Sequence, residues 1–192
     1  MIKLVNVNQS FKERTVLRNI NLTVEAGETL ALIGGSGSGK STLLRLMVGL
    51  LRPTSGEIWI DDEEISRLGE EALDRVRLKM GMVFQYSALF DSMTVGENVA
   101  FGLREHTAYD EAKIRRIVAE KLALVGLPDA SDMMPDELSG GMKKRVGLAR
   151  AIAFAPSIIF YDEPDSGLDP VMTEKIDQLI LTMQRQLKVT SV

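Results

Sequence analysis

A glycine-rich stretch at residues 34–42 carries the clearest chemical signal in the sequence. It follows an apolar run at residues 29–33 and precedes a leucine-rich segment, so we expect a buried strand, a tight turn and an amphipathic helix. Closely spaced glycines let backbone N–H groups turn inward around an anion. The expected phosphate-binding residues are Gly34, Gly35, Ser36, Gly37, Ser38, Gly39, Lys40, Ser41 and Thr42.

The spacing of Gly34, Gly39, Lys40 and Ser41 is that of the phosphate loop of nucleotide-binding proteins. The start of the following helix adds its partial positive charge to the same spot. Lys40 is long enough to reach the β- and γ-phosphates, and the Ser41 hydroxyl is a suitable ligand for Mg²⁺. A flexible linker would explain the glycines and serines, but it needs neither a buried strand before it nor a leucine-rich helix after it.

Two adjacent carboxylates, Asp162 and Glu163, follow a second apolar run at residues 157–161. Acids at the end of a buried strand are costly unless a cation meets them. In a sheet covered by helices, this edge is where ligands bind. We therefore expect Asp162 in the Mg²⁺ shell, through a water molecule, and Glu163 beside the attacking water. Solvated acids in an ordinary turn are the alternative.

A second glycine-containing turn, at Ser139, Gly140 and Gly141, begins another expected helix. A hydroxyl and bare N–H groups at a helix start can bind an anion. Ser139 can equally act as an ordinary N-cap with a flexible entry, and the pattern leaves both interpretations open. The helix that follows has an apolar stripe for packing, and the cationic Lys144 and Arg150 lie off this stripe.

Two isolated residues have no clear meaning by themselves. Gln85 follows an expected buried strand at residues 80–84, and a lone Gln after a strand is uninformative without its context. Phe11 lies upstream of Lys40 in a polar, turn-prone stretch, where an aromatic ring could stack on a base. From the pattern alone, an ordinary half-buried aromatic is the favoured interpretation of Phe11.

The elements that must position these residues alternate along the chain. Residues 1–33 alternate apolar and polar side chains, which predicts half-buried strands. Residues 68–78 predict a short amphipathic helix, and Thr-x-x-acid patterns at Thr94 and Thr107 predict two more helix starts. The strand and helix alternation on either side of residues 80–140 predicts an α/β fold, with one parallel-sheet core and a mostly helical insertion.

The composition limits the class of protein. With 192 residues, of which 45% are hydrophobic, the chain can build one good-sized domain. Its net charge of −4 argues against non-specific binding to nucleic acid, and the absence of cysteine rules out disulfides. The N-terminus lacks the apolar core of a signal peptide, and the longest apolar stretch, residues 151–161, is too short to span a bilayer. We therefore expect a soluble, cytosolic protein.

An ordered set of motifs resembles the nucleotide-binding subunits of ATP-binding-cassette transporters. The set consists of the phosphate loop, Gln85, a Leu-Ser-Gly-Gly turn at 138–141, the Asp-Glu-Pro run at 162–164 and a Ser-Gly-Leu-Asp run at 166–169. The resemblance covers essentially the whole chain. It implies a P-loop NTPase fold with a RecA-like, mostly parallel sheet, an N-terminal antiparallel β subdomain and a helical insertion.

The resemblance also implies how the chain is divided. Residues 1–192 form one ATP-binding domain, with its core at about 1–84 and 143–192. The helical insertion occupies about 85–142 and contains the signature turn. Such subunits pair head to tail with a second copy, sandwich two ATP molecules with Mg²⁺, and contact a membrane-spanning permease.

The resemblance assigns a mechanism to these residues. An in-line water hydrolyses ATP, Lys40 and Mg²⁺ offset charge on the phosphoryl oxygens, and Glu163 acts as general base. The resemblance further implies that Phe11 stacks on adenine, that Gln85 joins the Mg²⁺ and water site to the membrane partner, and that Asp169 couples the two ATP sites. The implied Mg²⁺ ligands are Ser41, Gln85 and Asp162. The residues implied to face the partner's ATP are Ser139, Gly140 and Gly141.

Residues 84–107, together with Met142 after the signature glycines, resemble the Mla-type branch of this family. ATPases of that branch drive lipid movement between bacterial membranes, or into plastids, with an MCE-domain lipid-binding protein. The implied location is the cytoplasmic side of the membrane, or the stromal side of a plastid membrane in a plant. A polar amino-acid importer ATPase is the alternative within the family.

One departure from the family concerns its switch histidine, which follows the strand after the last helix. The only histidine, His106, lies in the expected insertion and does not take that role. The sequence stops at Val192, about where that strand would finish, so we interpret the C-terminus as truncated. A hydrolysis-deficient ATP-binding fragment is therefore a further alternative. Family ATPases that act on DNA or ribosomes are disfavoured, because the chain has one cassette and no heptad array.

Overall fold

The N-terminal residues form an antiparallel sheet, as their alternating pattern predicts. The computed structural model describes all of residues 1–192. In its first sheet, β1 (Ile2–Phe11) pairs with β2 (Arg14–Val24) on one side and with β3 (Ser55–Ile60) on the other. The two-residue β4 (Glu63–Glu64) extends the sheet beyond β3. This sheet confirms the predicted N-terminal β subdomain.

The second sheet is parallel and short. β5 (Met80–Val83) pairs with β6 (Ile158–Tyr161), and β6 pairs with β7 (Thr190–Ser191). The last residues of β5 and β6 lie opposite each other, so the segments that follow them leave the sheet at the same edge. The Asp162 N–H, for example, donates to the Val83 carbonyl at 2.9 Å. This edge is therefore where side chains after the two strands can meet.

The apolar run before the phosphate loop does not form the buried strand that we expect at residues 29–33. Thr29 makes a single bridge to Ser191, and Ile33 is 96% exposed. The physical reason is pairing. The neighbouring strand, β7, has only two residues. The Leu30 N–H donates to the Ser191 carbonyl at 2.9 Å, and this is the last backbone hydrogen bond between residues 29–33 and β7. Apolar side chains alone do not make a strand where the backbone has no neighbour.

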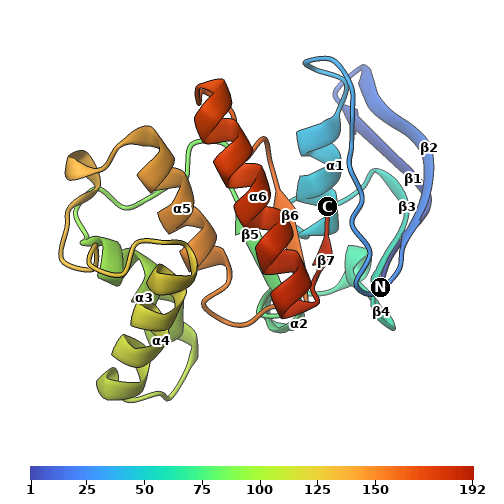
Figure 1. Ribbon diagram of the computed structural model, residues 1–192. Coiled ribbons are helices and arrows are strands. Elements are labelled where there is room, and N and C mark those ends of the chain that lie inside the picture. The colour runs from blue at the N-terminus through green and yellow to red at the C-terminus, as the bar shows by residue number, and fades with distance from the viewer.

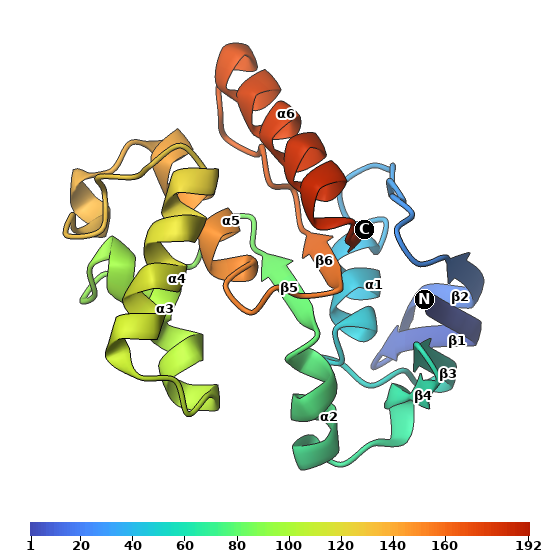
Figure 2. The ribbon, with the colours of Figure 1, turned by 60° about the horizontal axis from the view of Figure 1, so that its bottom comes forward.

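Six α-helices surround the parallel sheet. They are α1 (Lys40–Met47), α2 (Glu70–Arg77), α3 (Val95–His106), α4 (Glu111–Leu124), α5 (Gly140–Ala151) and α6 (Pro170–Leu187). In Figures 1 and 2, α1 lies between the two sheets, and α3, α4 and α5 group on the far side of β5. This arrangement confirms the predicted α/β fold with a helical insertion. None of the helices is long and apolar enough to cross a membrane.

β6 separates two apolar cores. Ile158 and Phe160 pack into a core with the antiparallel sheet and α1, whereas Ile159 packs into a core with α3, α4, α5 and α6. All three residues are at most 1% exposed, as expected for a strand that is covered on both faces. The inserted helices therefore share their core with β5, β6 and α6. The boundaries of the predicted division at residues 84 and 142 remain a prediction.

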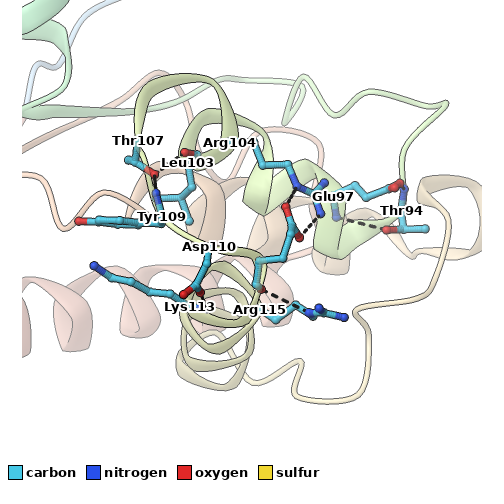
Figure 3. Close-up of polar contacts among 10 residues, drawn as sticks. Thr94, Glu97, Leu103, Arg104, Thr107, Tyr109, Asp110, Lys113 and Arg115 are labelled. Carbon is cyan, nitrogen blue, oxygen red and sulfur yellow. Dashed lines mark hydrogen bonds and ion pairs between the residues drawn. The ribbon is translucent and has the colours of Figure 1, made fainter.

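The helix starts of the inserted region show where local patterns succeed and fail (Figure 3). The capping box of Thr94 and Glu97 is confirmed, because each side chain accepts the other's backbone N–H, at 3.2 and 2.8 Å. The predicted start at Thr107 is wrong. Asp110 caps α4 by accepting a backbone N–H at 2.7 Å, while Thr107 donates back to Leu103 in the last turn of α3. A carboxylate is favoured at a helix start because it complements the partial positive charge there.

Candidate functional site

The phosphate loop ends in a glycine whose conformation excludes other residues. Gly39 has a φ of 102°, and a Cβ at this position would lie 2.9 Å from Leu17 Cδ2. Gly39 also N-caps α1, and no side chain accepts the first N–H groups of that helix. These donors, together with the partial positive charge of the helix start, are available to an anion.

The Lys40 side chain forms hydrogen bonds with the backbone of its own phosphate loop. Its Nζ donates to the carbonyls of Gly34 at 2.8 Å and Gly35 at 3.3 Å, and it lies 4.0 Å from Glu163 Oε1. Neutral carbonyl oxygens are weaker partners for an ammonium group than a phosphate is. The same lysine can therefore turn towards a polyphosphate without breaking a strong buried ion pair.

A polar cavity of about 370 Å³ opens over the loop. Most of its lining comes from the phosphate loop and the first turn of α1, and the rest comes from Arg14, Val16, Gln85 and Glu163. Val16 is the only hydrophobic residue in this lining. The volume is within the range of small-molecule sites, and the polar lining suits a charged ligand better than an apolar one.

A hydroxyl and a carboxylate meet at the edge of this cavity. Ser41 Oγ donates to Asp162 Oδ1 at 2.7 Å, and Asp162 is only 9% exposed. No lysine or arginine forms an ion pair with Asp162. A buried carboxylate without a cationic partner, beside a hydroxyl, is a set of hard oxygen donors that fits Mg²⁺.

Glu163 lies next to this pair in a strained conformation. Its φ is 48°, which is unfavourable for a residue that carries a Cβ. Gln85 Nε2 donates to Glu163 Oε2 at 2.9 Å and to Ser166 Oγ at 3.2 Å. The structure therefore brings Gln85 and Glu163, which lie far apart in the sequence, into contact with each other and with the cavity.

The predicted aromatic Phe11 is not part of the cavity lining. Phe11 is 45% exposed and pairs across the β1–β2 turn with Arg14, which does line the cavity. Stacking of Phe11 on adenine thus remains a prediction. Arg14 makes no hydrogen bond or ion pair through its side chain and was not predicted, because nothing in the local sequence indicates that the turn folds over the phosphate loop.

The signature turn lies outside the cavity. Ser139 Oγ accepts the Met142 N–H at 3.3 Å, so Ser139 acts as the N-cap of α5. Neither Gly140 nor Gly141 contributes to the cavity lining. Asp169 is likewise an N-cap, because its Oδ1 accepts two N–H groups at the start of α6, at 3.0 and 3.1 Å. The N-cap interpretation describes the geometry of the signature turn within one chain, and an anion-binding role for this turn remains a prediction.

Two cations on α5 contact the segment after β5 and were not predicted. Lys144 donates to the carbonyl of Gln85, and Arg150 donates to the carbonyls of Ser87 and Ala88. Both cations lie off the apolar stripe of their helix, so the sequence pattern indicates solvent exposure. Lys144 is buried and Arg150 is half-buried, and this burial lowers the pKa of both side chains.

The chain matches one protein family and several ATP-binding proteins of transport systems. The family described as ABC transporter matches residues 17–166. The chain is 47% identical over 189 residues to the probable ribonucleotide transport ATP-binding protein mkl of Mycobacterium bovis, covering 98% of this chain and 53% of that protein. It is 45% identical over 192 residues to the intermembrane phospholipid transport system ATP-binding protein MlaF of Haemophilus influenzae, covering 100% of this chain and 73% of MlaF.

A third relative has another substrate in its name. The methionine import ATP-binding protein MetN of Carboxydothermus hydrogenoformans is 49% identical over 174 residues, covering 91% of this chain and 51% of MetN. The chain spans about half the length of the mkl and MetN relatives. A solved dimeric structure of the ATP-binding cassette MJ0796, in a post-hydrolysis state with ADP and Pi, superposes with a TM-score of 0.91 at 36% identity. It covers 100% of this chain and 86% of that one.

Proposed function

The chain belongs to the ABC transporter family, since the family match covers most of its length, and on this premise we propose that it binds and hydrolyses ATP to drive transport. The observation that carries the proposal is the convergence of Lys40, Ser41 and Glu163 at one polar cavity, with Asp162 hydrogen-bonded to Ser41 at its edge. These groups can bind phosphates, hold a divalent cation and accept a proton, which are the three requirements of phosphoryl transfer to water.

In the proposed reaction, Lys40 binds the phosphate oxygens and the free N–H groups of the loop surround them. Ser41 and Asp162 would hold Mg²⁺, which supplies charge neutralisation at the β- and γ-phosphates when it is bound. Glu163, held by Gln85, accepts a proton from the water that attacks the γ-phosphorus. The bond between that phosphorus and the oxygen of ADP breaks, and ADP and phosphate leave.

Replacement of Glu163 tests this assignment. Glu163→Gln removes the proton acceptor but keeps the shape, so we expect phosphate release to fall by about a hundredfold or more while MgATP binding persists. Glu105→Gln, an exposed acid in α3, is the matched control and should release phosphate at the parent rate. Parent-like turnover in Glu163→Gln contradicts the proposal. If the unmodified chain binds ATP without releasing phosphate, the alternative of a hydrolysis-deficient fragment is correct.

We propose further that two copies pair head to tail, so that the signature turn of one copy covers the nucleotide of the other. Two observations support this pairing. The signature turn lies outside the phosphate cavity of its own chain, and the structurally similar cassette MJ0796 is dimeric. Light scattering of Glu163→Gln with MgATP should detect a dimer. Gly140→Asp should remain monomeric, because it places a negative charge against the partner's phosphates. A monomer in both variants contradicts the pairing.

A permease is the proposed membrane partner, and an aromatic patch is its proposed docking surface. We define the aromatic patch as Phe84, Phe90, Phe101 and Phe154, which line a cavity of about 430 Å³. The first three are 36–42% exposed, and the rings of Phe90 and Phe101 are 4.8 Å apart. Such a groove suits the apolar face of a short helix.

Co-purification with a co-expressed ABC transporter permease tests the docking surface. Phe101→Asp should abolish co-purification, because it places a charge in the apolar groove, whereas Phe101→Leu should retain it. Tyr109→Asp changes an aromatic residue of similar exposure outside the patch and should also retain the complex. Retention by Phe101→Asp, or loss in Tyr109→Asp, contradicts this surface.

Lipid is the proposed cargo, with an MCE-domain protein as a further partner at the cytoplasmic face of a bacterial membrane. The similarity of residues 84–107 and Met142 to the Mla branch supports this choice, as does full-length coverage of the chain by MlaF. The similarity to MetN favours amino-acid import as the second candidate. A reconstituted transporter supplied with labelled phospholipid or labelled methionine separates the two. ATP-dependent movement of methionine alone would overturn the lipid proposal. A plastid location has no support among the relatives named above, which come from bacteria.

A further inference from the structure

Two cationic side chains of α5 hold the backbone of the loop after β5. Lys144 Nζ donates to the carbonyl oxygen of Gln85. The Arg150 guanidinium donates to the carbonyl of Ser87 at 2.7 Å and to that of Ala88 at 2.6 Å. One helix therefore supplies the donors for three carbonyl groups within residues 85–88 of this loop.

This loop requires support because its backbone is strained. Ser87 and Ala88 have φ values of 60° and 47°, which are unfavourable for residues that carry a Cβ. Ser87 is only 3% exposed and packs on α5, where a Cβ at Gly147 would lie 3.5 Å from the Cβ of Ser87. Gln85, Ser87 and Ala88 of the loop contact α5, and α5 packs beside β5 (Figure 2).

Gln85 connects this loop to the acid that we propose as the general base. Its backbone carbonyl accepts from Lys144, and its side chain donates to Glu163 Oε2 at 2.9 Å. A continuous series of contacts thus runs from α5 through Lys144 and Gln85 to Glu163. The same α5 begins at the signature turn, residues 139–141.

The burial of Lys144 indicates that its charge has a purpose other than packing. Lys144 is 6% exposed and forms no ion pair within 4.0 Å. Its pKa is lowered by burial, which the more distant carboxylates of Asp165 and Glu163 oppose. A buried ammonium group without an ion pair is costly, and an apolar side chain would pack at lower cost. The only hydrogen bond that this ammonium makes is to the backbone of Gln85.

We propose that Lys144, assisted by Arg150, is a positioning residue that holds Gln85 against Glu163 and ties this contact to the helix that begins at the signature turn. The inference rests on the ATPase function proposed above. When α5 shifts, Gln85 shifts with it, so the rate of hydrolysis depends on the orientation of the signature turn. The phosphate loop is not part of this series, and its affinity for nucleotide is independent of Lys144.

Steady-state kinetics of the full chain test the positioning role. Lys144→Met keeps the length of the side chain and removes its donors, so we expect kcat to fall by about tenfold or more, because small misplacements of reacting groups are costly. The Kd of MgATP should change by less than about twofold. Lys144→Arg should restore most of kcat. Equal losses of kcat in the Met and Arg variants, or a weakened Kd, overturn the proposal.

A matched control and a double variant separate positioning from general damage. Lys121 in α4 is as buried as Lys144, at 7% exposure, and Lys121→Met should keep the parent kcat. If Lys144 acts through Gln85, the double variant Gln85→Ala/Lys144→Met should have the kcat of Gln85→Ala alone. Multiplicative losses in the double variant, or a loss in Lys121→Met equal to that in Lys144→Met, overturn the proposal.

Hydrogen exchange without nucleotide separates this proposal from the ATPase proposal. In Lys144→Met, amides of residues 84–90 should exchange at least about tenfold faster than in the parent chain, because the strained loop loses its donor. Amides of residues 95–106 in α3 should be unchanged. Exchange in residues 84–90 at the parent rate overturns the positioning role even if the chain hydrolyses ATP. Faster exchange in a chain that hydrolyses no ATP overturns the ATPase function and leaves the structural contact in place.

Discussion

Two helices of this chain begin at glycine-containing turns, and they differ in what satisfies their first N–H groups. α1 follows Gly39, which offers no side-chain acceptor, whereas α5 follows Ser139, whose hydroxyl accepts the Met142 N–H. The start of α1 lies in a polar cavity beside Lys40 and the strand-end acids, and the start of α5 does not. Glycine therefore leaves the backbone N–H groups at a helix start accessible, and the charged groups on neighbouring elements determine whether a ligand can bind there.

The same comparison explains why the signature turn is an incomplete site by itself. No cation or carboxylate of the phosphate cavity lies at residues 139–141. The turn has an exposed Ser139 and Gly140 and a buried Gly141, against which Met172 of α6 packs closely. A second copy of the chain would bring to this turn the phosphates that its own surroundings lack, which is the basis of the proposed pairing.

The largest predicted difference between the two helix starts concerns their glycines. Gly39→Ala should destabilise the chain by about 1–3 kcal/mol and weaken MgATP binding by about tenfold or more, because of its φ of 102° and its contact with Leu17. Gly140→Ala should leave stability unchanged or raise it by up to about 1 kcal/mol, because its Cβ meets only Leu168 Cδ2 at 3.7 Å. Urea unfolding and nucleotide titration measure both. Equal effects at the two positions would remove the distinction.

A smaller effect is predicted for the cation above the phosphate loop. Arg14→Ala should weaken MgATP binding by about two- to fivefold, since an exposed cation contributes about 1 kcal/mol or less, and the effect should shrink at high salt. Arg18→Ala, on the same strand but outside the cavity lining, is the matched control and should bind as the parent chain does. Calorimetric titrations at two salt concentrations make the comparison. Identical affinities of the Arg14 and Arg18 variants would exclude Arg14 from the site.

The smallest effect is predicted at the second helix start. Ser139→Ala removes the N-cap of α5 and should cost about 1 kcal/mol of stability. Nucleotide binding by the single chain should be unchanged, because Ser139 lies outside the cavity. Thermal unfolding with and without MgATP measures both quantities. A Ser139→Ala variant that no longer binds MgATP as a monomer would contradict the contrast between α1 and α5.

Elements that depend on neighbouring residues could be predicted from the sequence. The alternation that forms β1 and β2, the apolar runs of β5 and β6, and the capping box at Thr94 all involve contacts within a short stretch or a general burial pattern. The contact of Gln85 with Glu163 after β6 was implied only by resemblance to a family. Its structural basis is the parallel pairing of two strands that are distant in the sequence.

Features that depend on distant partners could not be predicted. Residues 29–33 have the composition of a strand, but only pairing with β7 decides whether they form one. Lys144 and Arg150 have the sequence context of solvated cations, yet they contact carbonyl groups about sixty residues away, because α5 packs on the loop after β5. Arg14 likewise enters the cavity only through the placement of a hairpin turn beside the phosphate loop.

Calorimetric titration of MgATP into the parent chain, Lys40→Ala and Ser139→Ala tests the central claim most directly, which is that one chain binds a triphosphate at the start of α1. The account predicts one site per monomer, an affinity reduced by about a hundredfold or more in Lys40→Ala, and parent affinity in Ser139→Ala. Parent affinity in Lys40→Ala, or no uptake of MgATP by the parent chain, would contradict it.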